Sequence, residues 1–326
     1  MVDYYAGAIL RIEGTTTAAP PHISAASEAL TYTLREPVGV VGQIVPWNVP
    51  LCIAILKLTP ALAAGCTVVV KPSEETPLSI LLLGQLILDA GFPAGVVNIV
   101  NGYGATAGEA LAEHPRVDKI SFTGSTATGR RIVQAAIGNL KKVSLELGGK
   151  SPVVVMADAD LDLATPGVAM ATFFMQGQNC MAGTRIFVHE AIHDDLVAGV
   201  AAFADNMTVG HGLNPTTQHG PMISDAHSAK VMSYIDRGVA EGARLVTGGS
   251  KLDRPGNFIA PTNFADTTAD MAIVRDEIFG PVMSVRRFAT DDVDAIAALA
   301  NDTVFGKRWL APVARLSLTF SGTPMA

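Results

Sequence analysis

The stretch 173–185 combines a thiol with amides and glycines. It reads Phe-Phe-Met-Gln-Gly-Gln-Asn-Cys-Met-Ala-Gly-Thr-Arg, follows an apolar segment and precedes a predicted strand at 184–188. In such a polar, glycine-flanked loop a substrate can reach Cys180, and the backbone can aim its thiol. A nucleophile needs both properties, and it must be present as thiolate, from a free pKa of about 8.5. The alternative is that Cys180 is a small buried hydrophobe.

Glu146 and Asn48 could assist such a nucleophile. Glu146 is the one acid in the apolar stretch 143–147, where burial would raise its pKa toward that of a useful general base. The alternative for Glu146 is a salt bridge, for example to Lys150. Asn48 lies in a loop stiffened by two prolines, and its amide suits a developing oxyanion. The alternative for Asn48 is that it caps the helix that follows.

Three further stretches are candidates for holding a nucleotide. A buried strand ends on Lys71, Ser73 and Glu74, where a ribose would lie in an α/β sheet. A carboxylate there accepts from ribose hydroxyls and repels an added 2′-phosphate; the alternative is a solvated strand end. Residues 122–129 place glycines and hydroxyls at a helix start, which suits phosphate. Residues 102–108 come close to Gly-x-Gly-x-x-Gly but could equally form an ordinary turn.

The composition narrows the class of protein. The 326 residues are 49% hydrophobic with a net charge of −7 and no basic cluster, which argues against nucleic acid as a partner. No run of about 18 apolar residues marks a membrane span, so we attribute the apolar composition to a parallel sheet covered on both faces. Three unclustered cysteines indicate a reducing compartment, the cytoplasm by default, with Cys52 and Cys66 in the core. We see no metal-ligand spacing and predict no metal.

From Val38 onward the chain alternates between strands and helices. Predicted strands are 39–45, 66–70, 96–100, 119–122, 143–147, 152–155 and 184–188. Predicted helices are 50–64, 77–90, 105–114, 126–137, 161–175, 192–206 and 224–241. This alternation predicts a doubly wound parallel sheet, with ligands at the carboxyl ends of the strands. We place a domain boundary near Gly148-Gly149 and expect residues 30–36 to form a half-exposed strand.

Taken together, these stretches resemble the NAD(P)-dependent aldehyde dehydrogenase superfamily. The order is the family's own: Pro-Trp-Asn, Lys-Pro-Ser-Glu, Phe-Thr-Gly-Ser, Leu-Glu-Leu-Gly-Gly-Lys, Gly-Gln-Asn-Cys and Glu-Ile-Phe-Gly-Pro. The resemblance implies a Rossmann-like, doubly wound cofactor domain at 1–147, with an oligomerisation arm at about 19–37. It also implies an α/β catalytic domain at 148–306.

The resemblance implies four catalytic residues. Cys180 would attack the aldehyde, and the side chain of Asn48 with the Cys180 N–H would hold the oxyanion. Glu146 would activate the water that releases the acid, and Lys57 matches a lysine of the family's proton path.

The resemblance also implies NAD as cofactor, with NADP disfavoured by Glu74. Lys71, Ser73 and Glu74 match adenosine-ribose contacts, Gly124 and Ser125 match pyrophosphate contacts, and Glu277 matches the nicotinamide-ribose ligand. The full set of implied cofactor contacts is Val45, Trp47, Lys71, Ser73, Glu74, Gly104, Gly124, Ser125, Thr128, Gly129, Glu277 and Phe279.

The two ends depart from the family's pattern. The family has a further stretch before Tyr4, and the tail 307–326 matches nothing in it, so we expect a chain truncated at both ends that lacks the family's oligomerisation strand. Two alternatives to a working NAD-dependent enzyme for an aldehyde substrate stay open. They are a non-catalytic remnant and a relative that transfers the acyl group to coenzyme A.

Overall fold

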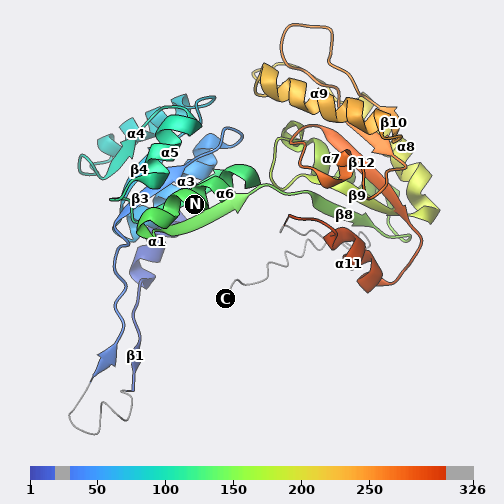
Figure 1. Ribbon diagram of the computed structural model, residues 1–326. Coiled ribbons are helices and arrows are strands. Elements are labelled where there is room, and N and C mark those ends of the chain that lie inside the picture. The colour runs from blue at the N-terminus through green and yellow to red at the C-terminus, as the bar shows by residue number, and fades with distance from the viewer. Residues whose placement is uncertain (19–29, 306–326) are drawn as a thin grey trace. The chain divides into compact units, whose positions relative to one another are not determined.

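A computed structural model describes residues 1–18 and 30–305 of the chain. The chain divides into two compact units, one from Met1 to Leu147 and one from Gly148 onward, and each contains its own five-stranded sheet (Figure 1). The predicted tail 307–326 and most of the predicted arm lie outside the described residues.

The first unit is a doubly wound parallel sheet with the order β5-β4-β3-β6-β7. The chain runs outward from β3 in one direction and then crosses back to β6 and β7, so the strand order reverses beside β3. The predicted fold class is confirmed. The strands are β3 (Val40–Ile44), β4 (Thr67–Lys71), β5 (Val97–Ile99), β6 (Lys119–Gly124) and β7 (Lys142–Leu147).

Helices cover both faces of this sheet. Adjacent residues Ile44 and Val45 point to opposite sides, one toward α5 and α6 and the other toward α3 and α4. This alternation explains why the strands are apolar throughout. The helices are α3 (Pro50–Ala63), α4 (Leu78–Asp89), η2 (Gly104–Gly108), α5 (Glu109–Glu113), α6 (Thr126–Ala136) and η3 (Ile137–Asn139).

An N-terminal helix and a short hairpin precede the sheet. They comprise α1 (Val2–Ala8), η1 (Ile9–Arg11) and the antiparallel pair β1 (Thr16–Thr17) and β2 (Thr31–Tyr32). The predicted strand at 30–36 is therefore too long. The ladder becomes irregular at Thr33, whose hydroxyl accepts the Thr15 N–H at 2.8 Å in place of a backbone carbonyl.

The second unit has a mixed sheet with the order β10-β11-β12-β9-β8, in which only β10 is antiparallel to its neighbour. Its strands are β8 (Ser151–Val155), β9 (Gly183–His189), β10 (Arg244–Thr247), β11 (Thr262–Ala265) and β12 (Val282–Phe288). Its helices are α7 (Leu161–Phe173), η4 (Phe174–Gly177), η5 (Glu190–Ile192), α8 (His193–Asp205), α9 (Asp225–Ala240), α10 (Ala272–Arg275) and α11 (Val293–Asn301).

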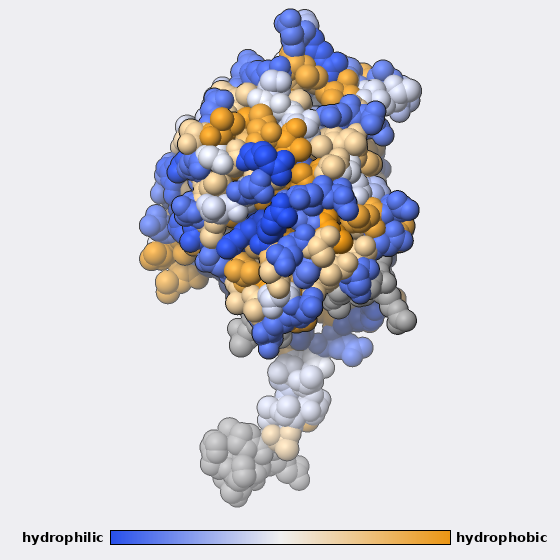
Figure 2. Space-filling model, turned by 90° about the vertical axis from the view of Figure 1, so that its right-hand side faces the viewer, coloured by the Kyte–Doolittle hydropathy of each residue, from blue (hydrophilic) through white to orange (hydrophobic). Residues whose placement is uncertain are grey.

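Each face of this second sheet has its own core. Ile186 and Val188 of β9 pack with α7 and α8, whereas Phe187 between them packs with α11. On the surface seen in Figure 2, hydrophobic residues are interspersed with hydrophilic ones. Within the described parts of the chain, no helix is both long and apolar enough to cross a membrane.

Candidate functional site

Cys180 lies in the loop between η4 and β9, where it is partly exposed. The alternative that it is a sealed core residue is therefore wrong. The chain reaches this loop through three successive left-handed residues, Met175, Gln176 and Gly177, with φ values of 52°, 58° and 66°. Left-handed backbone costs about 1–2 kcal/mol at each non-glycine residue, and such strain persists only where the surroundings fix it.

The surroundings of this loop do fix it. A side chain at Gly177 would collide with the carbonyl of Gly280, so only glycine fits there. The buried amide of Gln178 accepts from Ile223 N at 3.0 Å and donates to Pro221 O at 3.4 Å. The thiol is thus carried by a loop whose path is determined by packing and hydrogen bonds.

The second unit also holds the carboxylate of Glu277, a candidate for binding a ligand. The Gly149 N–H donates to its Oε1 at 3.0 Å, and a side chain at Gly148 would overlap the carboxylate. Phe279, two residues on, also has a left-handed backbone, with φ of 62°. Its carbonyl oxygen lies 2.7 Å from Nε2 of His227. Glu277 and Phe279, both predicted cofactor contacts, therefore sit in one tightly held segment.

In the first unit, Lys71 and Glu74 form an ion pair at the carboxyl end of β4, with Nζ and Oε2 2.9 Å apart. Lys71 is only 3% exposed, whereas Glu74 is exposed. Partial burial acts to raise the pKa of Glu74, but backbone N–H groups, including that of Gly104, and the Lys71 ammonium outweigh it and hold the pKa below its usual value. Glu74 is thus kept as a carboxylate acceptor. The alternative of a merely solvated strand end does not fit the buried Lys71.

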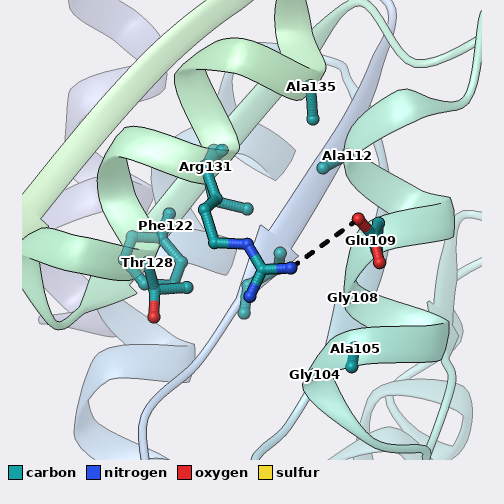
Figure 3. A pocket seen from close by; sticks show the side chains of 11 residues that line it. Gly104, Ala105, Gly108, Glu109, Ala112, Phe122, Thr128, Arg131 and Ala135 are labelled. Carbon is teal, nitrogen blue, oxygen red and sulfur yellow. Dashed lines mark ion pairs between the residues drawn. The ribbon is translucent and has the colours of Figure 1, made fainter.

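A cavity of about 200 Å³ lies between η2–α5 and α6, close to these residues (Figure 3). Two predicted cofactor contacts, Gly104 and Thr128, line it from opposite walls. The ion pair between Arg131 and Glu109, at 4.0 Å, spans the cavity. The sequence did not single out these last two residues, because each reads there as an ordinary solvated helix position.

The start of α6 borders this cavity and is capped by a side chain. Ser125 is the N-cap of the helix, and its Oγ accepts the Thr128 N–H at 3.2 Å. Gly129 lets the helix approach β7, since a side chain there would meet Leu147 at 2.7 Å. At Gly124, an added side chain would meet the ring of Phe122 at 2.5 Å.

Three catalytic candidates lie in the first unit: Lys57, Glu146 and Asn48. Lys57 is buried in α3, and its Nζ donates to Ser121 Oγ at 2.8 Å. Burial lowers the pKa of Lys57 to about 8, against the opposing attraction of Glu146. Asn48 immediately precedes Val49, the N-cap residue of α3.

Some predicted environments are wrong. Glu146 is exposed rather than buried, because it alternates outward with Lys142 on β7, the edge strand of the sheet. Its proposed partner Lys150 is buried and belongs to the second unit. Cys66 is buried as expected, but Cys52 is exposed on α3.

Val45 and Trp47 flank the start of the loop that follows β3. Val45 is buried and its N–H donates to Lys71 O at 3.0 Å, which ties this loop to the end of β4. The carbonyl of Trp47 accepts from the Thr76 hydroxyl at 3.4 Å. Asn48 and its neighbours thus lie at the same sheet edge as Lys71.

The strand orders define two α/β units, the first of them doubly wound. The sequence pattern of the Aldehyde dehydrogenase family matches residues 1–309, and the chain belongs to that family. The chain is 50% identical over 304 residues to retinal dehydrogenase 2 of Mus musculus, covering 93% of this chain and 57% of that protein. It is 48% identical over 305 residues to aldehyde dehydrogenase family 2 member C4 of Arabidopsis thaliana, covering 93% and 59%.

Solved structures that resemble this chain include aldehyde dehydrogenases. The NAD⁺ complex of an aldehyde dehydrogenase from Bacillus cereus superposes with a TM-score of 0.90 at 42% identity, over 95% of this chain and 62% of that one. The chain therefore spans about 60% of the length of each of these three relatives.

Proposed function

We propose that this protein oxidises an aldehyde to a carboxylic acid with NAD, through a covalent intermediate on Cys180. The observation that carries the proposal is the thiol loop: a partly exposed cysteine on a strained, fixed backbone, in a chain of the aldehyde dehydrogenase family. Strained backbone at a reachable nucleophile is typical of sites where the geometry serves chemistry.

The first unit fits the adenosine end of NAD. The Lys71–Glu74 pair offers a donor and an acceptor to a ribose at the carboxyl end of β4, and Glu74 opposes a 2′-phosphate. The cavity between α5 and α6 has room for one part of a dinucleotide, and the N-cap of α6 suits the pyrophosphate. When bound, NAD supplies the acceptor for the hydride.

Residues of this chain would carry out the nucleophilic attack, hold the oxyanion and activate the water. The Cys180 thiolate adds to the aldehyde carbon, giving a thiohemiacetal whose oxygen is held by the Asn48 amide and the Cys180 N–H. Loss of hydride from that carbon leaves a thioester. Glu146 then takes a proton from water, whose oxygen attacks the thioester and displaces the Cys180 thiolate, giving the carboxylic acid. Glu277 and Phe279 would hold the nicotinamide ribose.

The exposed position of Glu146 is compatible with this role. A base that receives its proton from water must be reached by water, and Lys57 nearby in the same unit attracts its negative charge. Lys57 and Ser121, in hydrogen-bond contact, offer a path by which the proton leaves Glu146.

The surroundings of the thiol favour an apolar aldehyde. Phe174 and Met181, on either side of Cys180 in the sequence, are 54% and 47% exposed despite being large and apolar. Exposed apolar side chains next to a nucleophile are suited to hold the hydrocarbon part of a substrate.

A direct test is NADH formation by the purified chain with NAD and a simple apolar aldehyde. We expect absorbance of NADH to rise with the wild-type protein and to fall to background with Cys180→Ala, because no other cysteine lies in the thiol loop. Cys52→Ala is the matched control and should retain the wild-type rate. Equal rates for wild type and Cys180→Ala would contradict the proposal, and an acyl-coenzyme A product would favour the acyl-transferring alternative.

We propose a cytoplasmic location, supported by the three free cysteines, which suit a reducing compartment. The hairpin of β1 and β2 as part of an oligomerisation arm stays a prediction.

A further inference from the structure

One side of α9, a 16-residue helix of the second unit, carries polar side chains at seven-residue spacing (Figure 1). They are His227, Tyr234 and Glu241, the last of which caps the C-terminus of the helix. Seven residues make nearly two full turns, so the three side chains lie above one another on the same side. We call them the α9 anchors, because each one is hydrogen-bonded to the segment 272–279. That segment carries both predicted contacts with the nicotinamide ribose.

The first anchor holds the end of the segment. Nε2 of His227 lies 2.7 Å from the carbonyl oxygen of Phe279. A carbonyl oxygen can only accept, so Nε2 carries the proton in this bond. Burial lowers the pKa of His227, although the Phe279 carbonyl acts to raise it, and the neutral ring therefore places its single N–H here. The two rings also meet edge to face, with centroids 6.2 Å apart.

The other two anchors hold the middle and the start of the segment. The Tyr234 hydroxyl donates to Oδ2 of Asp276 at 3.2 Å, directly before Glu277. Oε2 of Glu241 accepts the N–H of Ala272, the first residue of α10, at 2.7 Å. A carboxylate at a helix start supplies a partner to an N–H that the helix itself leaves without one. The segment therefore runs antiparallel to α9 and is held at three points.

Apolar packing also holds α9 against this segment, but without direction. Val231 and Ile235 of α9 are buried and belong to the same core cluster as Ile273 and Ile278. Burial of apolar surface is non-directional, whereas a hydrogen bond weakens steeply when its angle changes. The apolar cluster therefore accounts for most of the stability of this contact. The α9 anchors fix where the segment stands along the helix, and with it the position of Glu277.

We propose that the α9 anchors are positioning residues for the nicotinamide end of the cofactor: their bonds to the segment 272–279 set the place of the Glu277 carboxylate and the Phe279 ring. This inference rests on the proposed use of NAD. The proposed adenosine contacts lie in the first unit, so changes to the anchors should leave them intact.

The first test is calorimetric titration of the full chain with NAD and, separately, with AMP. His227→Leu should bind NAD about fivefold more weakly, the loss expected for one hydrogen bond, and AMP within about twofold of wild type. His227→Gln, whose amide can donate to the same carbonyl, should recover most of the NAD affinity. Ser233→Ala is the control, because the Ser233 hydroxyl donates to Lys230 O of the same helix, and it should bind both ligands as wild type does.

Hydrogen–deuterium exchange of the free protein tests the anchors without the cofactor. Tyr234→Phe removes one hydroxyl and keeps the ring, so this variant should fold even if His227→Leu does not. We expect the amides of residues 276–279 to exchange about fivefold faster in Tyr234→Phe than in wild type, while those of α8 exchange alike.

Several results would overturn the proposal: unchanged NAD affinity in His227→Leu, equal losses for NAD and AMP, no recovery in His227→Gln, or wild-type exchange of residues 276–279 in Tyr234→Phe. If His227→Leu does not fold, the anchor is structural and the proposal fails as well. If the wild type binds NAD and the variants bind it equally well, the positioning role fails alone. If the wild type binds neither NAD nor AMP, the proposed cofactor function fails with it.

Discussion

At the scale of single residues, we propose that the charge of Glu74 favours NAD over NADP. Its carboxylate is exposed beside the buried Lys71, and its lowered pKa keeps it ionised at neutral pH. A phosphate on the ribose 2′-oxygen would bring two negative charges close together, which costs a few kcal/mol at an effective dielectric constant of about 20.

We therefore expect Glu74→Gln to raise the ratio of kcat/KM for NADP to that for NAD by at least about tenfold. Steady-state rates with the two cofactors measure this ratio. Glu75→Gln, at the neighbouring exposed acid, is the matched control and should leave the ratio unchanged. The same ratio in Glu74→Gln as in wild type would remove the argument for NAD from this carboxylate.

The candidate site residues could be selected from the sequence motifs. The surroundings of several of these residues could not be predicted in this way. Cys180, Glu146 and Glu277 were selected because each lies in one of the motifs that resemble the family. The exposure of Glu146 depends on β7 being an edge strand, and the burial of Lys150 depends on packing between distant segments. Neither property is contained in local spacing.

At the scale of elements, we propose that the Ser125 cap of α6 serves both the helix and the pyrophosphate of NAD. The Ser125 hydroxyl accepts the Thr128 N–H and lies 2.9 Å from the Thr128 hydroxyl. A Ser cap contributes about 1 kcal/mol to helix stability, and the same helix start attracts anions.

Ser125→Ala should therefore lower the free energy of unfolding by about 1 kcal/mol and weaken NAD binding by about three- to tenfold. Urea unfolding and calorimetric titration measure the two effects. Asp160→Ala removes the comparable cap of α7 in the second unit, and we expect a similar loss of stability with unchanged NAD affinity. If both variants bind NAD equally well, α6 is not the pyrophosphate site.

The element boundaries show what local patterns predict well. The sequence predicted the ends of three strands, β3, β4 and β6, to within about two residues. It did so because glycine, proline or charged residues end the apolar runs there. The start of α5 was not predicted to be π-helical, since Gly104–Gly108 has no local signal for a wider turn. The short strands β10 and β11 were missed because their pairing with distant residues, not their own pattern, defines them.

At the scale of the whole molecule, two buried lysines should couple stability to pH. Folding lowers the pKa of Lys57 to about 8 and that of Lys150 to about 7, from an ordinary value of 10.5. Between these limits the unfolded chain binds more protons than the folded protein, so the free energy of unfolding rises as pH rises. Below about pH 7 both lysines are protonated in both states, and their contribution no longer changes.

Each lysine should contribute up to about 1.4 kcal/mol per pH unit above its folded pKa. Urea unfolding between about pH 7 and pH 9 measures the slope, which we expect to be shallower in Lys57→Met and Lys150→Met than in wild type. Lys230→Met, at an exposed lysine, should keep the wild-type slope. Identical slopes in all four proteins would show that neither lysine titrates as described.

The proposed chemistry draws on both units, with Cys180 and Glu277 in one and Asn48, Lys57 and Glu146 in the other. The motifs, their order and the glycine pair before Lys150 could all be recognised in the sequence. Because these groups come from both units, covalent capture of the substrate tests the two units together.

That capture is measured by mass spectrometry of Glu146→Gln after acid quenching with aldehyde and NAD, because this variant forms the thioester but hydrolyses it slowly. We predict an added acyl group on the peptide that contains Cys180, present only when both aldehyde and NAD are supplied. An acyl group on Cys52 or Cys66 instead, or no acyl group on any cysteine, would contradict the assignment of Cys180 as the nucleophile.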